Sequence, residues 1–230
     1  MRWAVAAHPN ADPERRLPWA AVELQLSLQL WQAAGAAMTM LDASQPRADK
    51  VNALLGIGHG VAPGQSLANA GLLIAGQRGL TAHHLTEVRT CRRVLLSCCV
   101  LGKIDTVIGA ALGFLSACFG HQTEFGMGWL TDVPDAEACL FSMAFQFALW
   151  QADSLPRPEP VRWSQVFNDT RNGVAAGHWP AGFAAWLKYN LPLALVASAE
   201  TGLKPPSDWM LSDPPPMLRR LMPWAIALEQ

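Results

Sequence analysis

Two residues with the chemistry of a catalytic pair, Cys99 and His59, each stand at the end of a short apolar run. Residues 94–102 read VLLSCCVLG, and residues 54–60 read LLGIGHG. A cysteine thiolate with a histidine beside it can attack a carbonyl carbon and then protonate the leaving group. We therefore predict Cys99 as a nucleophile and His59 as its acid and base.

The elements needed to bring these residues together are those of an α/β protein. Apolar runs that do not alternate with polar residues are typical of strands in a parallel sheet. We expect strands at residues 3–7, 37–41, 53–57, 94–97 and 124–130, and a hairpin arm at 72–75 that turns at 76–79. We expect helices at 18–33, 106–117, 136–150, 163–176 and 181–190, and the start of another at 80–81. This order predicts a mostly parallel sheet with helices on both faces.

The expected catalytic edge is the one where parallel strands end, because ligands bind there in open α/β sheets. His59, Cys99 and Asp132 all follow strands that are expected to end at this edge. The backbone N–H groups of Gly60 and Cys99 would form an oxyanion hole there. Neighbouring side chains of a strand point to opposite faces, so Cys98 is expected to pack rather than react.

Metal and nucleotide chemistry have weaker support. The other candidate metal ligands are Cys118, His121, Cys139, His83 and His84. They lack the two properly spaced ligand pairs of a structural zinc site. The run Gly56–Gly60 carries three alternating glycines but not the G-x-G-x-x-G spacing of a dinucleotide site. We therefore expect no metal and no cofactor, and we expect His8 and His178 to lie in loops.

The composition favours a globular protein of the cytoplasm. The chain has 230 residues, of which 51% are hydrophobic and 15% charged, and its net charge is -1. Nothing in this balance points to a nucleic-acid partner, and no apolar run reaches the about 20 residues that a membrane span needs. The first residues meet His8 and Pro9 too soon for a signal peptide. Five cysteines without paired spacing favour a reducing compartment.

Five segments, taken in chain order, match the motifs of one family. They are LPWAAVE at 17–23, GHG at 58–60, LLI with LT at 72–81, LSCCVLG at 96–102 and LTDVPD at 130–135. They resemble L-P-x-A-x-x-E, the end of H-x-A-x-H-G, the hairpin that follows it, L-S-A-C-E-T-G and L-W-x-V-x-D. These are motifs of the CHAT peptidases, which are caspase-like domains related to separase and the caspases. The resemblance covers residues 1–190 and leaves 191–230 as a proline-rich extension, packed on the domain and ending in a surface segment at 217–228.

The resemblance implies a caspase-like three-layer sandwich and a cysteine endopeptidase with a His59–Cys99 dyad. Family members are often bacterial effectors in antiviral defence or cell death. A sensor switches them on, and they cleave a partner protein. Because this chain carries no repeats of its own, a separate activating subunit is expected. The acids Asp132 and Asp135 resemble a separase segment whose acid lines a pocket for arginine, although Asp135 could equally cap the helix expected from Ala136.

The sequence also departs from the family pattern at three places. Val100 follows the cysteine where the family has glutamate, Leu130 replaces the tryptophan, and the first histidine of H-x-A-x-H-G is absent. A second hypothesis therefore stays open, in which the chain is a catalytically silent CHAT-like module. Such a module would bind a partner through the apolar surface that its low charge suggests.

Overall fold

The structure is a computed structural model, which describes residues 1–7, 16–41, 51–61, 71–74, 77–81, 92–99, 123–156, 159–200, 202–205 and 212–229. Along 59–61, 71–74, 77–81 and 98–99 it describes the backbone. The helix expected at 106–117 and residue 76 of the turn expected at 76–79 lie outside these residues.

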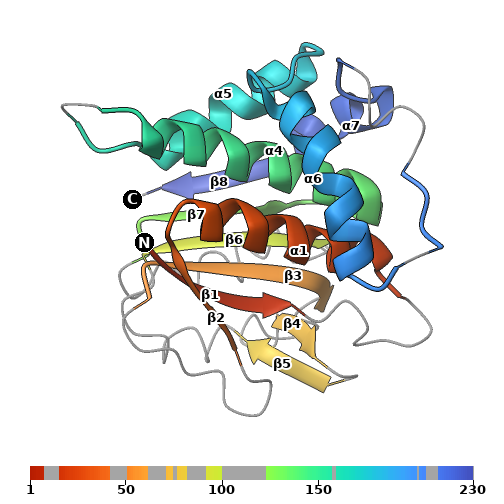
Figure 1. Ribbon diagram of the computed structural model, residues 1–230. Coiled ribbons are helices and arrows are strands. Elements are labelled where there is room, and N and C mark those ends of the chain that lie inside the picture. The colour runs from red at the N-terminus through yellow and green to blue at the C-terminus, as the bar shows by residue number, and fades with distance from the viewer. Residues whose placement is uncertain are drawn as a thin grey trace.

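A twisted sheet forms the centre of the molecule, with the strand order β2-β1-β3-β6-β7-β8 (Figure 1). Its strands are β1 (Arg2–Ala7), β2 (Ala37–Met40), β3 (Ala53–Val61), β6 (Arg93–Cys99), β7 (Phe125–Trp129) and β8 (Ala225–Glu229). Every pairing from β2 to β7 is parallel, and β8 alone in this order runs antiparallel to its neighbour β7. The expectation of an α/β protein with a mostly parallel sheet is confirmed.

The inner strands are continuous apolar runs because the sheet has no solvent-facing side along them. Every residue of β7 is buried, and so is β1 from Trp3 onward. In β3 and β6 the described side chains are buried from Ala53 to Gly58 and from Val94 to Ser97. Burial at successive positions explains why these strands show no polar alternation.

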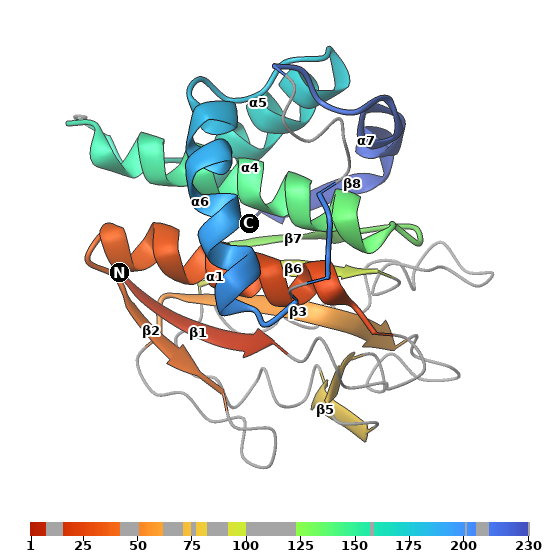
Figure 2. The same cartoon turned by 45° about the vertical axis from the view of Figure 1, so that its right-hand side comes forward.

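A hairpin extends the sheet at the end of β3. Strands β4 (Gly71–Ile74) and β5 (Gln77–Thr81) pair antiparallel, and β4 pairs with β3 at Gly60 and Val61. Figure 2 shows this hairpin on the side of the sheet away from helix α1 (Pro18–Ala33). The predicted hairpin is confirmed. Residues 77–79, expected in its turn, and residues 80–81, expected to start a helix, belong to β5 instead. Strand β3 continues four residues beyond its expected end because Gly58 and His59 pair with β6, and Gly60 and Val61 pair with β4.

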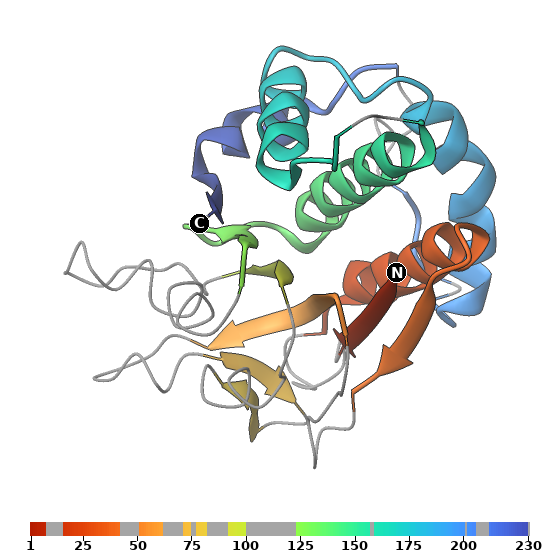
Figure 3. The same cartoon turned by 90° about the vertical axis from the view of Figure 1, so that its left-hand side faces the viewer.

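Helices α1 and α4 (Asp135–Ser154) lie side by side across one face of the sheet (Figures 1 and 3). Helix α1 begins at Pro18, whose fixed φ suits the first turn. Its buried residues Leu26, Leu30 and Trp31 pack into the core. Helices α5 (Trp163–Ala175) and α6 (Phe183–Ala197) pack against this pair. The described helices thus lie on one side of the sheet, and a helical layer on the other face stays a prediction.

The C-terminal segment completes the sheet. Short helix α7 (Pro216–Leu221) and the 3-10 turn η2 (Met222–Trp224) lead into β8, which pairs with β7 from Phe125 to Trp129. Residues 217–228 were expected to lie across the surface, and that expectation is wrong for the part in β8. The boundary expected after residue 190 falls inside α6. The physical reason for β8 is the otherwise open edge of β7, which exposes unpaired backbone groups.

In the described part of the chain, no helix combines the length and apolar character needed to cross a membrane. Several tryptophans instead form the core. Four tryptophans are almost fully buried: Trp3, Trp31, Trp129 and Trp163. The ring centroids of Trp3 and Trp31 lie 4.7 Å apart. Trp224 is half exposed.

Deleting residues 225–230 should destabilise the protein, because β7 would lose its antiparallel partner. Loss of this ladder at about 2–3 kcal/mol corresponds to a fall in melting temperature of about 5–10 °C for a chain of this size. Differential scanning calorimetry measures the fall, and deletion of Gln230 alone serves as the control. Equal melting temperatures for both truncated chains would contradict a structural role for β8.

Candidate active site

Strands β3 and β6 bring the two predicted catalytic residues to paired positions. The parallel register runs without a shift from Ala53 opposite Arg93 to His59 opposite Cys99. Neighbouring strands lie about 4.8 Å apart, so the backbones of His59 and Cys99 adjoin at the carboxyl ends of both strands. This juxtaposition is a property of the sheet, while the catalytic roles of the two residues stay predictions.

The backbone immediately before His59 requires a glycine. Gly58 has a φ of 147°, a value that residues with a side chain rarely adopt. Gly60, on the other side of His59, pairs with Leu72 of the hairpin. His59 therefore lies where β3 passes from pairing with β6 to pairing with β4.

A carboxyl group from helix α1 is buried beneath the end of β6. Ser97, two residues before Cys99, donates a hydrogen bond from its Oγ to Glu23 Oε2 at 2.6 Å. Glu23 is 1% exposed and Ser97 is 5% exposed. The Ser142 hydroxyl of α4 also lies beside the carboxyl group, but Glu23 Oε1 makes no hydrogen bond of normal geometry. Glu23, Ser97 and Ser142 are called the buried carboxyl cluster below.

Burial decides the protonation of this cluster. Desolvation raises the pKa of Glu23 from its ordinary value of 4.5 to about 8. The hydroxyls of Ser142 and Ser97 partly offset the rise in pKa, and the charge of Asp135 adds to it. Desolvation also raises the pKa of the buried Cys139 thiol, with Glu23 and Asp135 contributing. At neutral pH the Glu23 carboxyl is therefore protonated, and Cys139 is an unreactive thiol.

The polar contacts continue between α1 and α4. Gln146 Nε2 donates to Ser142 Oγ at 3.1 Å, and Trp31 Nε1 donates to Gln146 Oε1 at 2.9 Å. Ser27 Oγ donates to Met143 Sδ at 3.4 Å. The bonds of Trp31 and Ser27 join α1 to α4, and all three lie at buried positions, where the loss of a hydrogen bond leaves polar atoms unpaired.

Asp132 and Asp135, the two predicted pocket residues, have different surroundings. Asp132 is exposed in the turn between β7 and α4, at the carboxyl end of β7. Asp135 accepts a hydrogen bond from the Trp19 backbone N–H at 2.7 Å, and the Ala20 N–H also contributes. Asp135 thus caps α1, whose own N-cap Leu17 has no side-chain acceptor. The alternative that it caps the helix expected from Ala136 is wrong, because Asp135 is itself the first residue of α4 and Pro134 is the N-cap. Burial raises the pKa of Asp135 to about 6, against the opposing effect of these N–H groups.

Sequence reasoning identified Glu23 only as a motif residue and did not predict its burial. A signal was present, because Glu23 lies on the helix face that carries Trp19, Leu26 and Leu30. A charged residue within the apolar face of a helix is a candidate for a special role, since carboxylates are rarely buried without a partner.

The other ligand candidates do not assemble a metal site in the part of the chain that the structure describes. Cys139 is buried in α4. His178 lies between α5 and α6, as expected. The remaining candidates, and His8, lie outside the described residues; they are His83, His84, Cys118 and His121.

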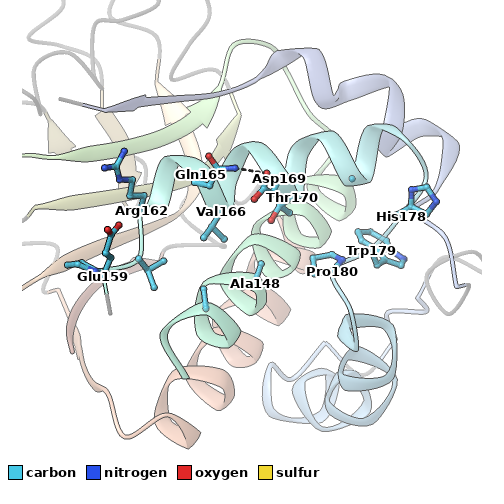
Figure 4. A pocket seen from close by; sticks show the side chains of 14 residues that line it. Ala148, Glu159, Arg162, Gln165, Val166, Asp169, Thr170, His178, Trp179 and Pro180 are labelled. Carbon is cyan, nitrogen blue, oxygen red and sulfur yellow. Dashed lines mark hydrogen bonds between the residues drawn. The ribbon is translucent and has the colours of Figure 1, made fainter. Parts of the chain in front are cut away.

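A separate cavity of about 550 Å³ opens between α4, α5 and the turn at 178–180 (Figure 4). Its wall combines apolar side chains such as Val166 and Trp179 with the polar pair Gln165 and Asp169, which are hydrogen-bonded at 2.8 Å. The described residues that line it come from helices and their connections, and none belongs to a strand. The cavity is therefore not part of the edge that carries His59 and Cys99.

No protein-family model matches the sequence, and no curated protein matches it. The family resemblance therefore depends on the five motif segments and on how they meet in space. The first segment contacts the fourth through Glu23 and Ser97, and the fifth through Asp135 and Trp19. Strand pairing joins the second to the third and the fourth. Contacts between described residues thus link all five segments to one another.

Replacing Glu23 by glutamine should change how stability depends on pH. The folded-state pKa of Glu23 lies above its unfolded value, so its protonation favours folding in acid and this contribution is lost as the pH rises through about 8. Between pH 6 and pH 8 the wild type should lose about 2 kcal/mol of unfolding free energy relative to Glu23→Gln.

Urea unfolding at several pH values measures this difference. The exposed Glu159 is the matched control, since Glu159→Gln makes the same substitution at the surface. Parallel pH profiles for the wild type and Glu23→Gln would show that the Glu23 carboxyl is not protonated in the folded protein.

Proposed function

We propose that this protein is a cysteine endopeptidase of the CHAT type, with Cys99 as nucleophile and His59 as acid and base. The observation that carries the proposal is the unshifted parallel register that sets His59 opposite Cys99 at the carboxyl ends of β3 and β6. A nucleophile and its base must lie within hydrogen-bond reach in the working enzyme. Directly paired positions on neighbouring strands bring the backbones of the two residues close together, which supports such a contact.

In the proposed reaction the Cys99 thiolate attacks the carbonyl carbon of the scissile peptide bond. The negative charge on the carbonyl oxygen is held by the backbone N–H groups of Gly60 and Cys99. His59 in its protonated form gives its proton to the leaving amine, and a thioester to Cys99 remains. His59 then takes a proton from water, which hydrolyses the thioester and restores the thiolate.

The contacts among the five motif segments support the same proposal. Hydrogen bonds and strand pairs join described residues of all five segments. The hairpin expected after the histidine strand is present as β4 and β5. We propose that residues 106–117 form a helix on the second face, which would complete a caspase-like three-layer sandwich.

We propose that the enzyme acts in the reducing cytoplasm, as a regulated effector that cleaves one protein partner in a defence or cell-death pathway. A reducing compartment keeps a catalytic thiol free of disulfides. An activator would be a separate subunit. The family resemblance supports this role.

A second candidate function is a silent binding module, and one observation favours it. Tyr189, Leu193 and Val196 of α6 are 75%, 54% and 76% exposed. Their spacing of four and three residues places them on one face of the helix. An apolar stripe of this kind is a common feature of protein-binding surfaces. A peptidase with an activating subunit would use the same stripe.

Substitution of Cys99 by alanine separates the two candidates. A catalytic thiolate reacts with iodoacetamide faster than a free cysteine near pH 7, because its pKa is lowered. We expect Cys99→Ala to remove the fast-alkylating thiol and abolish cleavage of a peptide library, while Cys98→Ala retains both. Mass spectrometry of alkylated peptides and of library products measures the two effects. Unchanged alkylation and cleavage in Cys99→Ala would overturn Cys99 as the nucleophile. A wild type with neither a fast-alkylating thiol nor cleavage would leave the binding module as the better proposal.

Asp132 is proposed to select a basic residue before the scissile bond. Library profiling should therefore show arginine or lysine at that position. Loss of a charged hydrogen-bond partner costs about 1.5–3 kcal/mol, so Asp132→Asn should lower kcat/KM for arginine peptides about 10- to 100-fold.

The exposed Asp213 supplies the control, because Asp213→Asn removes the same charge elsewhere on the surface. An apolar preference in the wild type would remove the specificity proposal. A basic preference that survives in Asp132→Asn would assign selection to another acid.

A further inference from the structure

Burial of the Glu23 carboxyl in the buried carboxyl cluster lowers the stability of the fold. Moving a polar group from water into the core without a full set of hydrogen bonds costs free energy. Glu23 is 1% exposed, and only its Oε2 is hydrogen-bonded. A well-packed apolar side chain at such a position is often neutral or stabilising by comparison. Folding alone therefore does not account for a carboxyl group here.

The ionisable groups that act on Glu23 do not stabilise its ionised form. Asp135 of α4 carries a like charge and raises the pKa of Glu23, and Cys139 of α4 is itself a buried thiol. The polar groups that stabilise the carboxyl are hydroxyls, from Ser97 on the sheet and Ser142 on α4. In its protonated form Glu23 is a neutral hydrogen-bonding group placed between α1, α4 and β6.

The position of Ser97 connects this carboxyl to the proposed dyad. Ser97 pairs with Ile57 across the β3–β6 ladder, and the next positions of the same parity pair Cys99 with His59. Glu23 is thus hydrogen-bonded to Ser97, the residue of β6 that directly precedes Cys98 and Cys99. A hydrogen bond that fixes Ser97 therefore also restricts the backbone of β6 that carries Cys99.

Helix α1 is firmly anchored on both sides of Glu23. The Asp135 carboxylate caps its first turn at Trp19, and the Trp31 indole is hydrogen-bonded to Gln146 near its last turn. Both anchors belong to α4. The carboxyl of Glu23 therefore projects from a helix that hydrogen bonds to α4 hold in place.

We propose that Glu23 is a positioning residue, which fixes the end of β6 through Ser97 so that Cys99 meets His59. This inference depends on the proposed peptidase function. Glu23 does not touch the substrate. It acts through the backbone of β6, two residues away from the nucleophile, and sets how well the thiol is placed to be activated by His59.

The test uses a pair of variants that separates positioning from stability. In the double variant Glu23→Met with Ser97→Ala, both hydrogen-bonding partners are replaced by apolar groups, which is close to neutral for folding. Glu23→Gln keeps the shape and an acceptor for the Ser97 hydroxyl. All chains carry Cys98→Ala, so that alkylation of the Cys99 peptide reports one thiol.

The measured quantity is the rate of Cys99 alkylation by iodoacetamide between pH 5 and pH 10, followed by mass spectrometry. With Cys98→Ala alone, the apparent pKa of Cys99 should lie below the about 8.5 of a free cysteine. In the double variant we expect alkylation at pH 6.5 to fall at least about tenfold, with an apparent pKa near that of free cysteine. Glu23→Gln should stay within about twofold of the parent, and the unfolding free energy of the double variant should not fall.

The possible outcomes lead to different conclusions. If Cys99 of the parent titrates like a free cysteine, the proposed function fails. If the parent thiol is activated and the double variant alkylates with the same rate and pKa, the positioning role fails and the peptidase proposal stands. If Glu23→Gln is as slow as the double variant, the Ser97 contact is not the route, which also overturns the inference. Should the double variant not fold, Ser97→Ala alone is read in the same way.

Discussion

The parallel pairing of β3 with β6 is the constraint on which the rest of the structure depends. Both strands are buried at successive positions, so their register is strongly specified: a slip of one residue would exchange the two faces of each strand. The same pairing sets where α1 and α4 pack, because the residues of one face must meet those helices. It also decides that His59 and Cys99, distant in the chain, occupy opposed positions at one edge.

The layer between the sheet, α1 and α4 combines an apolar core with a small number of polar groups. Burial dominates there, and it raises the pKa of Glu23, Asp135 and Cys139 together. The charge of Asp135 further raises the pKa of Glu23, and the charges of Glu23 and Asp135 further raise the pKa of Cys139, which favours the neutral forms of these two groups. Asp135 offsets its desolvation by capping α1, whereas Glu23 has one unpaired oxygen. The polar groups of this layer are therefore unequal, and Glu23 is the one that folding explains least.

The proposed site and the exposed stripe on α6 lie on different parts of the fold. The site is at the carboxyl edge of the sheet, and α6 packs against α1 on the helical side. Because α1 carries Glu23 and contacts α6, it is the element that links the stripe to the end of β6. Helix α1 would thus take part both in the binding of a partner on α6 and in the placement of Cys99.

Local patterns in the sequence determined α1, the buried strands and the hairpin. Pro18 sets the start of α1, and uninterrupted apolar runs mark strands that are buried on both sides. Four features were decided by tertiary structure: the extension of β3, the strand β8, the cap from Asp135 and the burial of Glu23. Each depends on a partner far away in the chain, such as the open edge of β7 for β8 or Trp19 for Asp135. Short local patterns cannot predict such pairings, because the free energy that favours them arises only when the distant segments are already packed together.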